Sequence, residues 1–190
     1  MANRCIFQIA LLLCFSATAF SMSYHLLRSR QRSSNLACQR MLNELNGTLT
    51  ECLLQRINIT IPEEIKQPQL LQKEDILLVT YVMLQQIFGI FSRNFSHTFW
   101  NESITEKLFL ELQQQMDYLE TTLKERKEEE RKKEDVIRCN RTISRLKKYY
   151  SRLLKYLKAN GYSSCAWVIV KTEIFRNFFF LNRLTNYLPD

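Results

Sequence analysis

Cysteine, histidine and asparagine side chains carry most of the chemistry that this sequence could perform. The chain has six cysteines and two histidines. Two of the cysteines, Cys5 and Cys14, lie in an apolar N-terminal segment. The other four are Cys38, Cys52, Cys139 and Cys165. Four cysteines allow three different sets of two disulfides, and their spacing does not select one of them.

Metal binding and catalysis have no recognisable motif in the sequence. No CxxC or cysteine–histidine spacing typical of zinc sites occurs, and His25 and His97 are far apart. A glycine-rich phosphate loop, a GxSxG turn and a local histidine–carboxylate motif are also missing. We therefore expect no enzymatic activity, no cofactor and no metal site.

Asparagine offers a different chemistry, because five N-x-Ser/Thr sequons occur where about one or two would arise by chance. Their asparagines are Asn46, Asn58, Asn94, Asn101 and Asn140. Such an excess indicates N-glycosylation and therefore export. The sequence does not show which of the five are occupied.

The N-terminus supports export independently. Residues 1–21 contain Arg4, then an apolar run from Ile6 to Phe20, and end in a small-x-small cleavage pattern at Ser21. This order is typical of a secretory signal peptide. No later segment offers about 20 uncharged apolar residues, because Lys171 and Arg176 interrupt the best candidate. We expect residues 22–190 to form a single secreted domain without a transmembrane anchor.

These residues must be positioned by helices. With 46% hydrophobic residues but only 3 Gly and 3 Pro, the chain is expected to be all-α. Apolar periodicity predicts helices at residues 23–45, 73–93, 104–123, 136–159 and 165–188. A long connection, residues 46–72, separates the first two. The run KERKEEERKKED at 124–135 has balanced charge and reads as a solvated helix end or loop.

The helix at 136–159 carries cations without any acidic residue. They are Arg138, Arg141, Arg145, Lys147, Lys148, Arg152, Lys155 and Lys158. A basic stripe of this kind could bind nucleic acid, heparan sulfate, anionic lipid or an acidic receptor, or could simply be a solvated face. Export argues against nucleic acid as the main partner.

The last helix has more apolar surface than one core face needs. Trp167, Val170, Ile174, Phe178 and Leu181 fall within about 80° of one another and form a core stripe. The other side collects Val168, Thr172, Phe175, Arg176, Phe179, Phe180 and Arg183. We call this second set the contact face. Aromatics interleaved with cations suggest an exposed binding surface, although exposed residues without a role remain the alternative.

Long helices, a long first crossover and export are typical of helical cytokines. The segments SYHLLRSRQRSSNLACQ, NGTLTECL, IPEEIKQPQLLQKED, LKKYYSRLLKYLKA and YSSCAWVIVKTEIFRNFFFLNRLTNYL are more specific. Through them the chain resembles the type I interferon family over essentially its full length. The resemblance implies a five-helix up-up-down-down cytokine bundle. It also implies activation of a two-chain cell-surface receptor, with Janus-kinase signalling and antiviral and antiproliferative effects.

The resemblance assigns residues to both receptor chains. For the high-affinity chain they are Arg56, Lys171, Thr172, Phe175, Arg176, Phe179 and Phe180. Arg56 ends a family Cys-Leu-Lys-Asp-Arg pattern from which Leu54 and Gln55 depart, and the sequon at Asn58 lies two residues beyond it. For the second chain, the matching positions are Lys147 and Arg152.

The resemblance also implies one disulfide, Cys52–Cys165, between the crossover and the last helix. Cys38 matches a position that is unpaired within the family, whereas Cys139 has no counterpart. These two cysteines either pair with each other or both remain thiols, and we favour thiols. Two rival functions remain: another helical cytokine, or a basic secreted protein that binds glycans or membranes.

Overall fold

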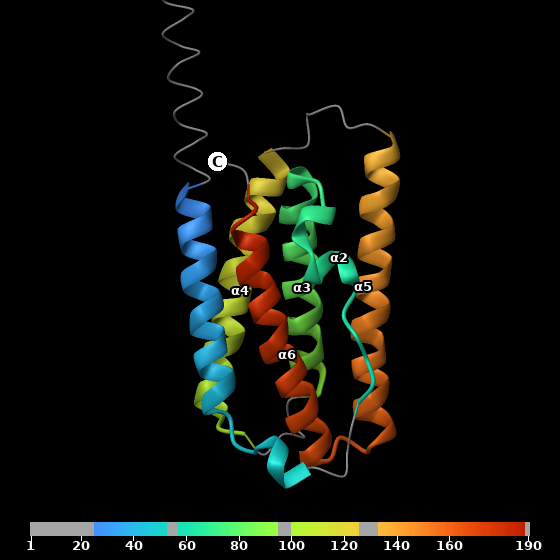
Figure 1. Ribbon diagram of the computed structural model, residues 1–190. Coiled ribbons are helices and arrows are strands. Elements are labelled where there is room, and N and C mark those ends of the chain that lie inside the picture. Colours follow the sequence, from blue (N-terminus) through green and yellow to red (C-terminus); the bar gives the residue numbers. More distant parts are fainter. Residues whose placement is uncertain (1–24, 53–56, 95–99, 126–132, 189–190) are drawn as a thin grey trace, which may run out of the picture.

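The computed structural model describes residues 25–52, 57–94, 100–125 and 133–188 (Figure 1). Five long helices dominate these residues: the N-terminal helix at 25–44, α3 at Lys73–Asn94, α4 at Glu102–Glu125, α5 at Lys133–Ala159 and α6 at Ser164–Thr185. Three short helices lie in the crossover: η1 at Leu49–Cys52, α2 at Glu63–Lys66 and η2 at Pro68–Leu70. No strand occurs among the residues described, and the all-α prediction is confirmed.

The chain direction gives the up-up-down-down order expected of a cytokine bundle. In Figure 1 the N-terminal helix and α3 run in the same direction, whereas α4 and α6 run in the opposite one. Two parallel neighbours need a long connection, which residues 45–72 supply. The second long connection, from α4 to α6, contains α5.

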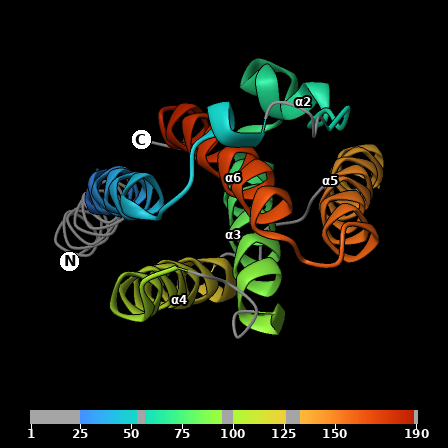
Figure 2. The same ribbon diagram turned by 90° about the horizontal axis from the view of Figure 1, so that it is seen from below.

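Helix α3 forms the centre of the bundle. It contacts α4, α5 and α6, which surround it in Figure 2. Its fully buried residues include Ile76, Leu77, Met83, Ile87 and Phe91. The window Asp75–Ser92 is long and apolar enough for a membrane span, with mean hydropathy 1.5, but 61% of it is buried inside the protein. A core helix has the same composition, and burial by its neighbours accounts for it here.

Helix boundaries differ from the predictions by a few residues, for local reasons. Helix α5 begins at Lys133, three residues before the expected start at Val136. Glu134 and Asp135 lie in its first turn, where carboxylates interact favourably with the helix dipole. The short helices of the crossover were not predicted, because three or four residues show no periodicity. Pro62 precedes α2 and Pro68 begins η2. The start of a helix tolerates proline, because its ring fixes φ near the helical value and the missing N–H would have no partner there.

Polar contacts fix α6 to its neighbours on both sides. On one side, Arg28 donates to the Leu188 carbonyl at 2.6 Å, and Asn35 donates to Thr185 Oγ1 at 3.4 Å. On the other side, the buried Asn177 accepts from Tyr149 and donates to Tyr150, both at 3.2 Å. Helix α6 is therefore held between the N-terminal helix and α5, which sets the direction of its remaining face.

Candidate functional site

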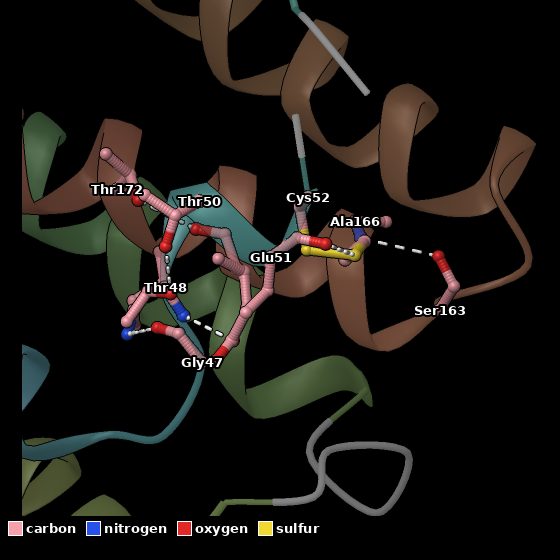
Figure 3. Close-up of a disulfide and its surroundings, with 11 residues drawn as sticks. Gly47, Thr48, Thr50, Glu51, Cys52, Ser163, Ala166 and Thr172 are labelled. Carbon is pink, nitrogen blue, oxygen red and sulfur yellow. Dashed lines mark hydrogen bonds between the residues drawn. A yellow bond between two sulfur atoms is a disulfide. The ribbon is translucent and has the colours of Figure 1, made fainter. Parts of the chain in front are cut away.

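The crossover is covalently attached to the start of α6. Cys52, the last residue of η1, forms a disulfide with Cys165, with 5.4 Å between their Cα atoms and a sequence separation of 113 residues (Figure 3). This is the pairing that the family resemblance implies. Ser163 caps α6 by accepting from the Ala166 amide at 3.3 Å. The disulfide therefore joins η1 to a well-defined helix terminus.

A second attachment comes from Lys171, which is only 8% exposed. Its Nζ atom lies 2.7 Å from the carbonyl oxygen of Leu45, 2.9 Å from that of Gly47 and 3.4 Å from that of Asn46. Trp100 Nε1 also donates to the Asn46 carbonyl, at 3.0 Å. Carbonyls at a helix C-terminus lack partners within the helix and carry partial negative charge, so an ammonium group stabilises them.

Burial lowers the pKa of Lys171, with the negative charge of Glu51 acting in the opposite direction. The turn that presents the three carbonyls depends on Gly47, whose φ of 90° lies in the left-handed region. We name this arrangement the Lys171 clamp. It directs the ammonium group into the protein, whereas the resemblance assigned Lys171 to the receptor surface.

The contact face of α6 largely lies where the periodicity placed it. Arg176 and Phe179 are exposed, the latter at 54%, and Thr172, Phe175 and Phe180 are half-buried. The rings of Phe175 and Phe179 meet edge to face, with centroids 5.5 Å apart. The face therefore presents a paired aromatic surface beside the exposed guanidinium group of Arg176.

Val168 departs from this pattern, since it was expected on the contact face but is 2% exposed. Helix η1 packs against α6, so part of the α6 surface lies under this cover. The sequence pattern of α6 alone could not show this cover. The exposed part of the contact face consequently begins at Thr172 rather than at Val168.

Glu173 belongs to the same surface, although the sequence did not single it out. Its carboxylate pairs with Arg176, with Oε1 and Nη1 2.7 Å apart. Burial raises the pKa of Glu173, and the neighbouring Arg176 opposes that increase. The pair orients the guanidinium group along the helix surface.

A hollow of about 500 Å³ adjoins the contact face. It is lined by residues 42–49 together with Lys171, Thr172 and Phe175. The end of the N-terminal helix, the first residues of the crossover and α6 thus share one surface, part of which appears in Figure 3. Arg56, the remaining residue assigned to the high-affinity receptor chain, lies outside the described residues.

The two residues assigned to the second receptor chain are both exposed on α5 but are not neighbours. Five helical positions separate Lys147 from Arg152, so they point about 140° apart around the helix. Arg152 lines a hollow of about 320 Å³ between α5 and residues 60–66. The structure does not bring Lys147 into that hollow.

The basic stripe of α5 is more ordered than its composition suggested. Six of its cations fall within about 100° of helix surface, and all six are exposed. They are Arg138, Arg141, Arg145, Lys148, Arg152 and Lys155. Two of them are paired: Arg138 with Asp135, and Arg145 with Glu64 of α2.

Four of the five sequon asparagines are exposed: Asn46, Asn58, Asn101 and Asn140. Asn101 also accepts from the Ile104 amide at 3.3 Å, so it helps to begin α4. The Asn94 side chain lies outside the described part of the structure.

Cys38 and Cys139 are both buried thiols. Cys38 lies on the N-terminal helix and Cys139 on α5, helices that stand on opposite sides of the bundle in Figures 1 and 2. They are therefore not placed to pair with each other. Among the described residues, no three metal-binding side chains come together.

Comparison with known proteins gives consistent matches. The family described as Interferon alpha/beta domain matches residues 27–188. Interferon beta of Macaca fascicularis and of Homo sapiens are each 56% identical to this chain over 191 residues, covering 100% of both proteins. The solved structure of zebrafish interferon 2 is similar with a TM-score of 0.66 at 18% identity, covering 80% of this chain and 97% of that one. The last similarity concerns the fold alone.

Proposed function

The chain belongs to the interferon alpha/beta family, and we propose that it is secreted, binds both chains of the type I interferon receptor and bridges them. As a type I interferon it is a cytokine, and its family is not an enzyme family. Its effect on a cell therefore comes from association. A ligand held by one receptor chain presents a high effective concentration to the second, which makes weak binding to that chain productive. The resulting Janus-kinase signalling produces an antiviral and antiproliferative response.

The observation that carries this proposal is the contact face beside a fixed crossover. Aromatic and arginine side chains dominate the energetics of many protein interfaces. Arg176, Phe175 and Phe179 provide such a set on a single helix. The disulfide and the Lys171 clamp hold the crossover next to it. We assign Thr172, Phe175, Arg176, Phe179 and Phe180 to the high-affinity chain, together with Arg56 from the family resemblance.

Lys171 has a different role in this assignment. Its ammonium group is buried against main-chain carbonyls. Lys171 therefore holds the crossover beside α6 and supports the receptor surface indirectly. For the second receptor chain we retain Lys147 and Arg152. Their divergent directions on α5 mean that a single flat contact cannot use both.

Binding of the purified, secreted protein to each receptor ectodomain tests the proposal. We expect tight binding to one chain and a loss of at least about tenfold in Arg176→Ala. The matched control is Lys107→Ala, which removes an exposed cation from α4. If wild-type protein binds neither ectodomain, the chain is a cytokine for another receptor.

Residues 1–21 act as the signal peptide in this proposal, and the mature chain begins at Met22. N-terminal sequencing of the protein recovered from culture medium tests this directly. Retention of residues 1–21 on a secreted product would contradict it.

The basic stripe favours heparan sulfate as an additional extracellular partner. Six of its cations follow one side of α5 over about 25 Å, a length suited to a short sulfated oligosaccharide. We expect the triple variant Arg141→Gln/Lys148→Gln/Lys155→Gln to elute from heparin at lower salt than wild type. The charge-matched control is Arg32→Gln/Arg40→Gln/Lys107→Gln. Equal shifts in both variants would indicate net charge alone, and membrane association would appear instead as salt-sensitive binding to anionic vesicles.

A further inference from the structure

One sequon lies on the proposed receptor surface itself. Asn46, in the sequence Asn-Gly-Thr, is exposed and lies two residues after the end of the N-terminal helix. It lines the same hollow as Thr172 and Phe175 of α6. The exposed asparagines of the other sequons, Asn58, Asn101 and Asn140, do not line that hollow. Of these four exposed asparagines, Asn46 is the one that lies beside the contact face.

The main chain at Asn46 is held in place. Its carbonyl oxygen accepts from Trp100 Nε1 at 3.0 Å and from Lys171 Nζ at 3.4 Å. The carbonyls on either side, of Leu45 and Gly47, also accept from Lys171. A carbohydrate attached here would therefore extend from a main-chain position that these hydrogen bonds hold in place.

The chemistry of attachment leaves these contacts intact. In the secretory pathway, the Asn46 Nδ2 atom would bond to the anomeric carbon of a lipid-pyrophosphate-linked oligosaccharide. The bond from that carbon to the pyrophosphate oxygen breaks, and the lipid pyrophosphate leaves as the amide nitrogen loses a proton. The main-chain carbonyl takes no part, so the Lys171 clamp is compatible with glycosylation.

We infer that N-glycosylation of Asn46 regulates receptor affinity: the glycoform that carries carbohydrate on Asn46 binds the high-affinity receptor chain weakly, and the form without it binds tightly. This inference rests on the proposed function. The physical cause is steric, because a bulky, hydrated oligosaccharide occupies the space over the hollow that the receptor must approach. Secreted protein in which Asn46 is partly occupied would then contain two populations with different receptor affinity.

The test uses the full chain secreted from mammalian cells. Glycopeptide mass spectrometry measures the occupancy of each sequon, and binding to the immobilised receptor ectodomains is compared among wild type, Asn46→Gln and Asn140→Gln. The last variant is the matched control, because it removes an exposed sequon on α5. Thr48→Val removes the same sequon as Asn46→Gln by a different change and serves if the first variant does not fold.

A second arm keeps the sequence unchanged. Protein made with high-mannose glycans is measured before and after an endoglycosidase trims each glycan to one sugar. We expect the fraction with carbohydrate on Asn46 to bind at least about tenfold more weakly than Asn46→Gln, and trimming to recover most of that loss. Asn140→Gln should leave the affinity of the wild type unchanged.

Two results would overturn the inference: absence of carbohydrate from Asn46 in the secreted protein, or affinity of the occupied form within about twofold of Asn46→Gln. Both results leave the proposed function standing, since the variants still bind the receptor. Failure of the wild type and of both Asn46→Gln and Thr48→Val to bind either ectodomain while folded would instead contradict the proposed function.

Discussion

The Nζ atom of Lys171 lies 2.7 Å from the main-chain carbonyl oxygen of Leu45, 126 residues earlier in the chain. A side chain from the last helix thereby donates to a carbonyl at the C-terminus of the first helix, where the helix itself offers no donor. The same ammonium group binds the Gly47 carbonyl at 2.9 Å, so one cation joins helix end, crossover and α6. The contact face of α6 and the first residues of the crossover are consequently joined by the same side chain.

Replacing Lys171 by Met tests this relationship, because Met keeps the aliphatic stem and removes the ammonium group. Carbonyls left without a partner in a buried site should lower the free energy of unfolding by about 1–3 kcal/mol. Urea denaturation measures this loss, and hydrogen exchange at Gly47 and Thr48 should accelerate. Lys171→Arg is the control that keeps a cation. Unchanged stability with lost receptor affinity would show that Lys171 contacts the receptor directly.

Glu173 gives a pH-dependent prediction. Burial raises the pKa of Glu173 above its ordinary value of 4.5, so the folded protein retains a proton that the unfolded chain has lost. The contribution of Glu173 to stability is therefore complete below about pH 4.5 and is lost as the pH rises through the folded-state value. Relative to Glu173→Gln, wild-type protein should become less thermally stable between about pH 4 and pH 7.

Thermal unfolding at several pH values measures that difference. The control is Glu106→Gln, which changes an exposed carboxylate of α4. Parallel curves for wild type and Glu173→Gln would contradict the prediction.

Removing the disulfide should weaken both stability and binding. A closed loop of roughly 100 residues contributes about 4.7 kcal/mol in the chain-entropy treatment, and Cys52 and Cys165 are 113 residues apart. We expect Cys52→Ser/Cys165→Ser to unfold at clearly lower guanidinium concentration. Its receptor affinity, measured under conditions where circular dichroism shows native helix content, should also fall. Full affinity in a destabilised protein would mean that the disulfide does not position the crossover.

The two remaining cysteines of the helical domain should be unreactive in the folded state. Cys38 is fully buried, and burial raises the pKa of its thiol, so little of the nucleophilic thiolate is present near neutral pH. Cys139 is 2% exposed. Reaction with a thiol reagent at pH 8 should be negligible in native protein and should yield two thiols per chain in denaturant. Rapid native labelling would contradict the burial of these side chains.

Periodicity was sufficient to predict the five long helices, because each repeats apolar residues over many turns. The core stripe of α6 follows the predicted positions from Trp167 to Leu181, all of them fully buried. Family resemblance supplied what periodicity could not, namely the chain directions and the pairing of Cys52 with Cys165. Those features depend on contacts between residues far apart in sequence.

The burial of Lys171 was not predicted, although a signal for it existed. Lys171 follows Trp167 by four residues and so lies about 40° from it around α6, beside the core stripe. The family resemblance placed Lys171 on the receptor surface, and an isolated charge is rarely buried. The carbonyls that accept from it come from the end of another helix, and no pattern within α6 reveals them. The same limit applies to the burial of Val168, since η1, α2, α3 and α5 all pack against α6.

Arg28 and Leu188, joined by a hydrogen bond of 2.6 Å, bring the first and last described turns together at one end of the bundle. The disulfide lies at the opposite end (Figures 1 and 3). The described residues thus begin and end close together, an arrangement suited to circular permutation through a short linker. A fusion partner attached near Arg28 or Leu188 would lie at one end of the bundle, and the hollow lined by residues 42–49 would lie at the other end. The molecule can thus be tethered by either end without covering the crossover.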